Sequence, residues 1–309
     1  MRGGTTIRIG LGIVLGVWCL MSPVSATSQA IAVIKSHDIE PFNQALAGFT
    51  AACNSRITEY DLRGNANLAK RIIRGINKAK PKLVLAIGSL AAQAAQEDVQ
   101  DIPVIFVMVP NPHKYGLKGD NIAGISLDIP AETQFMAYTS LVPTLRTFGV
   151  IYDPEKTATM ITQANAAAGQ LGLRLVAVPV ASSKEVPAAL RSMLGKIDAL
   201  WMVPDETVVT PESFKFLLVE AFENNLPFLA VSDIFVEVGA LAALSPDYTE
   251  LGRQGCQLAR AIESGQLQLA AVNVFPPEKI NLAINLKTAS KLGLTLPSEI
   301  VQSASKVYR

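Results

Sequence analysis

Ser89 stands where a small anionic group can bind. It follows the apolar run KLVLAIG at 82–88 and opens a helical stretch that continues with Leu90. The first turn of a helix offers free N–H groups and a partial positive charge, and a serine hydroxyl adds a donor. Ser89 and Leu90 can therefore hold a ligand carboxylate without an arginine. The alternative is that Ser89 only caps its helix.

Carboxylates and hydroxyls end two apolar runs in the second half of the chain. Asp205 and Asp233 are the last residues of these runs. Each can accept a charge-assisted hydrogen bond from a ligand ammonium. Thr207 and Ser232 place hydroxyls close by in the sequence. Since aspartate is common where a strand turns, each carboxylate can equally be an ordinary turn residue.

Two further candidates for ligand contact lie in the first half. Asn111 follows the apolar run at 102–109, and His37 follows the first apolar run. His37 can hydrogen-bond to a ligand or stack on it, or it can be a solvated surface group. Together with Asp38 and Glu40 it makes a poor metal cage, because one histidine and two carboxylates on a short loop are a weak ligand set. We expect no bound metal.

The motifs of common catalytic and cofactor sites are missing. No G-x-S-x-G surrounds Ser89, no G-x-G-x-x-G follows the first apolar run, and no P-loop is present. The sequence therefore favours a binding protein over an exported enzyme, and we expect no cofactor.

Apolar runs alternate with amphipathic stretches along the whole chain. Continuous apolar runs such as IAVIK at 31–35 are typical of strands buried on both faces of a parallel sheet, and NANLAKRIIRGINKA at 65–79 has helical spacing. The pattern predicts an α/β protein with doubly wound parallel sheets, and its restart at 147–153 predicts two lobes. Ligands of such sheets bind outside the carboxyl ends of the strands. Those ends carry Ser36-His37-Asp38, Gly88-Ser89, Pro110-Asn111-Pro112, Ser126-Asp128, Tyr152-Asp153-Pro154, Pro204-Asp205-Glu206-Thr207 and Ser232-Asp233.

The chain begins as secretory leaders do. Two arginines precede an apolar run at 9–20, which is shorter than the about 20 residues of a membrane span, and small residues follow it. We expect residues 1–26 to be a signal peptide cleaved after Ala26, with Ala30 as the alternative site. The mature protein is then periplasmic or extracellular.

Composition excludes several classes of protein. Of the 309 residues, 50% are hydrophobic, and the mean hydropathy of +0.31 argues against disorder. The net charge is +1, and it becomes −1 when the two leader arginines are removed. A near-neutral chain without a basic run carries no electrostatic footprint for nucleic acid, so we expect no nucleic-acid partner.

Two cysteines, Cys53 and Cys256, remain in the mature chain. An exported protein can keep a disulfide, but cysteines also serve as small buried hydrophobic residues. The sequence gives no separation between the two, and we favour two free thiols.

Several blocks of the sequence, taken in order, resemble one known family. They cover about residues 31–297 and read KPKLVLAIGSLAAQA, DIPVIFVMVPNP, NIAGIS, TFGVIYDPEKT, GKIDALWMVPDETVVTP, LPFLAVSD, GALAALSPDYTELGRQ and INLAINLKTASKLGLTLP. The chain is similar to substrate-binding proteins of ABC transporters with the type I periplasmic-binding fold. Within them it resembles the family that includes aromatic amino-acid binders.

The resemblance implies two lobes joined by three hinge crossovers, with the ligand clamped between them. It implies an N-terminal lobe of residues 27–147 and 247–272 and a C-terminal lobe of residues 148–246 and 273–309. The helix at 248–265 then returns to the first lobe. The residues implied to lie near the ligand are Ser89, Asn111, Asp205, Thr207, Ser232 and Asp233. Where relatives carry Thr-Asp-Pro, this chain has Pro110-Asn111-Pro112, a difference that removes a charge.

These observations predict a solute-binding protein. It captures a small polar or zwitterionic solute, an amino acid or a related compound, and delivers it as a monomer to an ABC permease at the inner membrane. The alternative is a ligand-sensing partner of a membrane receptor or sensor kinase, for which the local chemistry would be the same.

Overall fold

The computed structural model describes residues 1, 3, 30–267 and 274–309. Nearly all of the predicted leader, with its cleavage site after Ala26, therefore lies outside the described residues. Within the described part, no helix has both the length and the apolar character needed to cross a membrane.

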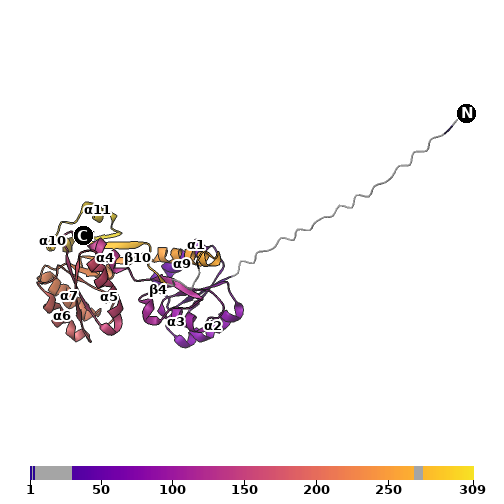
Figure 1. The fold of residues 1–309 in the computed structure, drawn as a ribbon, viewed down its shortest axis with the longest axis horizontal. Helices are drawn as coiled ribbons and strands as arrows, with labels where there is room; N and C mark the ends of the chain where they lie inside the picture. Colours follow the sequence, from indigo (N-terminus) through magenta and orange to yellow (C-terminus); the bar gives the residue numbers. More distant parts are fainter. Residues whose placement is uncertain (2, 4–29, 268–273) are drawn as a thin grey trace.

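The first lobe is built on a six-stranded parallel sheet (Figure 1). Its strand order is β11-β5-β4-β3-β1-β2. Four long helices cover it, α1 and α9 on one face and α2 and α3 on the other. The bounds are β1 Ile31–Lys35, α1 Glu40–Cys53, β2 Ile57–Asp61, α2 Ala66–Ala79, β3 Leu83–Ile87, α3 Ser89–Asp98, β4 Val104–Val109, the 3-10 turn η1 Pro112–Tyr115, β5 Ile122–Ser126, α9 Tyr248–Glu263 and β11 Val274–Phe275.

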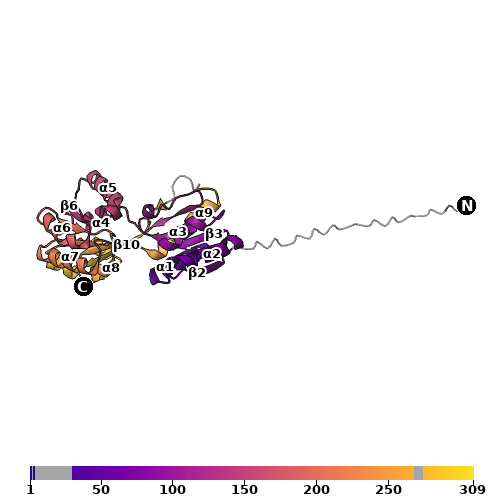
Figure 2. The ribbon, with the colours of Figure 1, turned by 90° about the horizontal axis from the view of Figure 1, so that it is seen from below.

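The second lobe lies beside the first and is built on a seven-stranded sheet (Figures 1 and 2). Its strand order is β13-β12-β10-β9-β8-β6-β7. Strand β12 pairs antiparallel with β10, and β13 pairs parallel with β12, so these two strands run opposite to the other five. Helices α4, α5, α10 and α11 pack on one face, and α6, α7 and α8 on the other. The bounds are α4 Ala131–Leu141, β6 Thr147–Tyr152, α5 Pro154–Gln170, β7 Arg174–Pro179, the 3-10 turn η2 Ser183–Glu185, α6 Val186–Met193, β8 Ala199–Trp201, α7 Pro211–Glu223, β9 Phe228–Ala230, α8 Asp233–Glu237, β10 Ala242–Pro246, β12 Ile280–Asn285, α10 Leu286–Lys291, α11 Ser298–Ser303 and β13 Lys306–Tyr308.

Three segments of chain connect the lobes, and two of them cross at places that differ from the sequence interpretation. Helix α4 belongs to the second lobe, because Phe135 stacks at 4.8 Å on Phe148 of β6 and at 5.0 Å on Trp201 of β8. The first crossing therefore comes before α4 and not near residue 147. Strand β11 pairs with β5 in the first sheet, so the last crossing follows Phe275 instead of preceding residue 273.

Helix α9 returns to the first lobe and lies against α1 in very close contact. A Cβ atom on Gly252 would overlap the backbone of Ala45, and one on Gly48 would overlap the backbone of Thr249. Only glycine permits helix backbones to approach this closely. The shared interface closes the face of the sheet that α1 alone leaves open.

A disulfide joins the two helices, and the prediction of two free thiols is therefore wrong. Cys53, the last residue of α1, is bonded to Cys256 of α9, and their Cα atoms lie 5.6 Å apart. This separation is within the range that a disulfide spans. The pair is 203 residues apart in sequence, and the return of α9 is what brings the two thiols together.

Candidate functional site

A cavity of about 180 Å³ lies at the floor of the cleft between the lobes. The carboxyl ends of β4 and β5 meet those of β8, β9 and β10 there. The other lining side chains come from the first crossover and from helices α4, α5 and α9. Its lining residues are Pro110, Leu127, Asp128, Ile129, Gln134, Met160, Met202, Pro204, Val231, Leu244, Ser245, Pro246 and Tyr248. Most of these are apolar, so the cavity suits the hydrophobic part of a small ligand.

Tyr248 supplies the aromatic ring of this cavity and was not among the predicted site residues. Asp247, which accepts the N–H of Glu250, caps the helix that Tyr248 begins. Burial raises the pKa of the Tyr248 hydroxyl, and the negative charge of Asp233 raises it further. Asp233 of the second lobe therefore acts electrostatically on the cavity. Tyr248 follows the end of β10 by two residues, as other candidates follow their strands, and this position is the signal that could have found it.

The start of α3 keeps unused donors, as the sequence predicts for Ser89 and Leu90. No hydrogen bond within the described residues uses the Ser89 hydroxyl or the N–H groups of Ser89 and Leu90. The next N–H group, that of Ala91, donates to the Ser36 hydroxyl at 2.9 Å. Gly88 makes this turn with φ of +89°, where a Cβ would strike Ser36 and Phe42.

Asn111 connects the two lobes directly. Its backbone has the left-handed conformation, with φ of 44°, which asparagine tolerates better than most residues. Its side-chain amide donates to the carbonyl oxygen of Lys156 in α5 at 3.3 Å, and its backbone N–H donates to Asp128 at 2.8 Å. The amide that was predicted to meet the ligand is therefore engaged with the second lobe in this arrangement.

Asp205 and Thr207 are engaged within the second lobe. The Asp205 side chain is buried, with 1% of the residue exposed. Its carboxylate accepts from the backbone N–H of Asp153 at 2.8 Å and from the Thr157 hydroxyl at 2.7 Å. It also accepts the N–H groups of Thr207 and Val208. The Thr207 hydroxyl donates to Asp153 at 2.7 Å. These contacts leave Asp205 without a free oxygen, so it positions the loop after β8.

Ser232 and Asp233 stand at the start of α8. Ser232 caps the helix by accepting the N–H of Ile234 at 3.4 Å. Asp233 pairs with Lys306 of β13 at 3.0 Å, and 39% of its side chain stays exposed. An exposed ion pair of this kind is weak, so a ligand ammonium can compete for Asp233.

His37 is exposed at the rim of the first lobe, beside Gly64. Its neighbour Asp38 pairs with the buried ammonium of Lys35 at 2.9 Å and is therefore occupied. The hydrogen bonds and the ion pair of Asp38 lower the pKa of its carboxyl. Ser89, Leu90, Asn111 and His37 thus follow the carboxyl ends of β1, β3 and β4 in the first sheet, and Ser232 and Asp233 follow that of β9 in the second. None of them lines the cavity of about 180 Å³.

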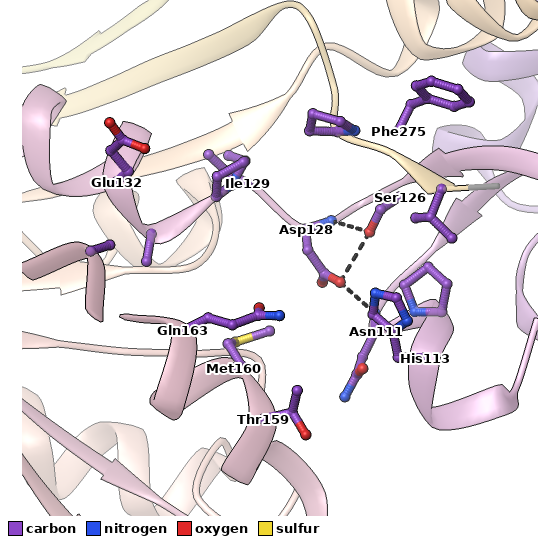
Figure 3. A pocket seen from close by; sticks show the side chains of 16 residues that line it. Asn111, His113, Ser126, Asp128, Ile129, Glu132, Thr159, Met160, Gln163 and Phe275 are labelled. Carbon is purple, nitrogen blue, oxygen red and sulfur yellow. Dashed lines mark hydrogen bonds between the residues drawn. The ribbon is translucent and has the colours of Figure 1, made fainter. Parts of the chain in front are cut away.

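Asp128 lies on the first crossover, between two cavities. It lines the cleft floor and also a second cavity of about 300 Å³ on the other side of the crossover. Figure 3 shows it between Asn111 and Ser126 of the first lobe and the α5 side chains Met160 and Gln163. Its Oδ2 accepts from Asn111 and, at 3.0 Å, from the Ser126 hydroxyl, and no hydrogen bond within the described residues reaches Oδ1. Burial raises the pKa of this carboxyl, and the two hydrogen bonds offset part of that rise.

Comparison with known proteins identifies the family. Residues 43–308 match the ABC transporter substrate binding proteins. The chain belongs to this family. A curated relative, the tyrosine-binding protein of Clostridioides difficile strain R20291, is 27% identical over 255 residues, which are 80% of this chain and 73% of the relative.

Solved structures show the same fold. The ligand-free, open structure of a substrate-binding protein with adhesive properties from Clostridium difficile is 23% identical, with a TM-score of 0.76 over 91% of this chain and 99% of the other. A protein from Streptococcus pneumoniae in complex with L-Trp is 24% identical, with a TM-score of 0.62 over 91% of this chain and all of the other. The expected type I periplasmic-binding fold is confirmed, and so is the expected family of substrate-binding proteins.

Proposed function

We propose that this protein captures an amino acid with an apolar or aromatic side chain between its lobes and delivers it to an ABC permease. The observation that carries the proposal is the largely apolar cavity at the cleft floor, with Tyr248, Met160 and Met202 in its wall. A ligand side chain buried there leaves the solvent. The printed ligands of two relatives, tyrosine and L-Trp, agree with such a side chain.

The polar groups of the ligand bind at the two rims. The α-carboxylate lies at the start of α3, where the N–H groups of Ser89 and Leu90 and the Ser89 hydroxyl are unused. Strand β3 neighbours β4, whose end reaches the cavity through Pro110, so the carboxylate and the side chain lie within one small molecule's reach. The ligand ammonium binds Asp233 on the opposite rim.

A ligand held by both rims favours the closed arrangement of the lobes. It contacts both lobes only when they approach, so its affinity for the closed form is higher, and this difference drives closure. A permease then distinguishes loaded from empty protein by shape. The protein acts in this way as a monomer, without a cofactor and without catalysis.

The disulfide supports a location outside the cytoplasm. Disulfides persist in oxidising compartments, and Cys53–Cys256 joins two helices of one lobe. Together with the predicted leader, this supports a periplasmic or extracellular protein.

Calorimetry of the protein without residues 1–26 tests the proposal, after a thermal-shift screen of amino acids, nucleosides and sugars. We expect an aromatic or aliphatic amino acid to bind, and a ligand at 100 times its dissociation constant to add about 2.7 kcal/mol of stability. Ser89→Ala should weaken binding by about 1–2 kcal/mol, because the backbone donors remain. Asp233→Asn should weaken it by about 2–5 kcal/mol in the closed, desolvated cleft.

Lys306→Gln is the matched control for Asp233→Asn. It removes the competing cation, so it should leave ligand affinity unchanged or raise it, while Asp233→Asn lowers it. Wild-type affinity in the Ser89 and Asp233 variants, or binding of only a nucleoside or sugar, would contradict the zwitterionic ligand.

A further inference from the structure

A separate, open groove lies on the first lobe, outside the cleft. It has a volume of about 570 Å³ and lies at the turn between β2 and α2. Its lining residues are Arg63, Asn65, Asn67, Leu68, Arg71 and Arg74. Three exposed arginines therefore line one groove, and none of the lining residues carries a carboxylate.

The positive charge of this groove is poorly compensated. The sequence of α2 contains four basic residues and no acidic residue. Arg71 has no ion-pair or hydrogen-bond partner within the described residues, and Arg74 donates only to the backbone oxygen of Lys70 at 3.3 Å. The nearest acidic partner is Asp61, which lies 4.0 Å from the highly exposed Arg63. Glu59 of the same strand forms an ion pair with Lys35 at 2.6 Å.

The donors of the groove are side chains and not the end of the helix. The side chain of Asn65 caps α2 and accepts the N–H groups of Asn67 and Leu68. Each arginine keeps several free N–H donors in a planar fork, a geometry that matches two oxygens of a phosphate at once. Lysine lacks that fork, so three arginines in one groove point to an oxyanion and not merely to a solvated basic face.

We propose that Arg63, Arg71 and Arg74 form a binding site for a phosphate group, distinct from the amino-acid cleft. The group is either free phosphate or the phosphate of an anionic lipid headgroup, since both present the same oxygens. Occupation of this site requires no amino acid in the cleft, so the proposal stands independently of the proposed function.

Titration with inorganic phosphate, followed through the arginine Nε–H resonances by NMR, tests the site. We expect saturable shifts of the Arg71 and Arg74 signals. Arg71→Gln combined with Arg74→Gln should weaken phosphate binding at least tenfold. The control combines Lys184→Gln with Lys215→Gln on the second lobe. It removes the same amount of charge and should leave phosphate binding unchanged. A titration with potassium chloride at the same ionic strength shows which shifts come only from charge screening by salt.

Co-sedimentation with vesicles separates the two sources of phosphate. The site is assigned to lipid headgroups if the protein binds phosphatidylglycerol vesicles but not phosphatidylcholine vesicles, and if only the arginine variant loses this binding. Saturable phosphate shifts without vesicle binding would assign it to the free ion. The proposal is overturned if the protein binds neither phosphate nor phosphatidylglycerol. It is also overturned if the arginine and lysine variants lose binding equally.

Discussion

The carboxylate of Asp205 accepts the hydroxyl of Thr157 at 2.7 Å, and this contact ties the loop after β8 to the first turns of α5. The same carboxylate oxygen accepts the backbone N–H of Asp153 at 2.8 Å. One buried side chain thus fixes the ends of two strands that face the cleft. The second lobe presents a preformed rim because these groups already satisfy one another.

Asp205→Asn should destabilise the protein without lowering its affinity for the ligand. An asparagine has only one acceptor oxygen, and its amide group would face donors of the protein. We expect the free energy of unfolding to fall by about 1–3 kcal/mol. Urea denaturation measures it, and the exposed Asp120→Asn is the control, expected within about 0.5 kcal/mol of wild type. Unchanged stability with lost ligand affinity would instead make Asp205 a ligand contact.

Asp128→Asn should stabilise the protein at neutral pH. Burial raises the pKa of Asp128, so its ionisation costs the folded state stability as the pH rises above the ordinary value of 3.8. The asparagine oxygen can still accept from Asn111 and Ser126 but does not ionise. The stability gain should be largest near neutral pH and should vanish below 3.8.

Urea denaturation of wild type and the Asp128 variant across this pH range measures the difference. Repeating it with His113→Gln in both proteins removes the charge that acts on Asp128 from the side of η1. A variant that is less stable than wild type at neutral pH would show that the charged form is favoured there.

Replacing both Cys53 and Cys256 by serine should cost substantial stability. The bond closes a loop of 203 residues, for which chain entropy predicts about 5 kcal/mol. Thermal and chemical denaturation measure the loss. Thiol titration of the unreduced, denatured mature protein should find no reactive thiol, and two reactive thiols would refute the bond.

Two glycine-to-alanine substitutions should act in opposite directions. Gly252→Ala forces a Cβ into the backbone of Ala45, and we expect it to cost about 1–3 kcal/mol. Gly75→Ala lies within α2 with open space around it, and we expect a gain of about 0.5–1 kcal/mol. Denaturant midpoints compare the two. Equal effects would mean that the α1–α9 contact can relax.

The sequence predicts strands and helices well where a single element carries its own pattern. Buried parallel strands are continuously apolar, so β1, β3 and β4 could be recognised without their neighbours. The lobe to which α4 belongs could not be predicted in this way, because an amphipathic helix has the same pattern whichever core it covers. Only the packing of Phe135 on Phe148 decides it.

The candidate site was harder to predict for a related reason. A strand-end aspartate has the same sequence signature whether its carboxylate stays partly exposed, as that of Asp233 does, or accepts several local hydrogen bonds, as that of Asp205 does. The α3 start was recognisable because it combines a buried strand, a glycine and a serine. Tyr248 was missed because the sequence pattern shows it only as the beginning of a helix. The disulfide was missed because its two cysteines are far apart in sequence.

The threading of the chain between the lobes has a consequence for biosynthesis. The first lobe receives α9 and β11 only after β6 to β10 have been synthesised, and the second lobe then still waits for β12 and β13. The first lobe is incomplete until β11 has been synthesised, and the second until β13 has. A nascent chain that ends before α9 leaves the apolar side of α1, with Ala45 and Phe49, uncovered. Such a chain is a ready client for chaperones, which would bind it until the last segment emerges.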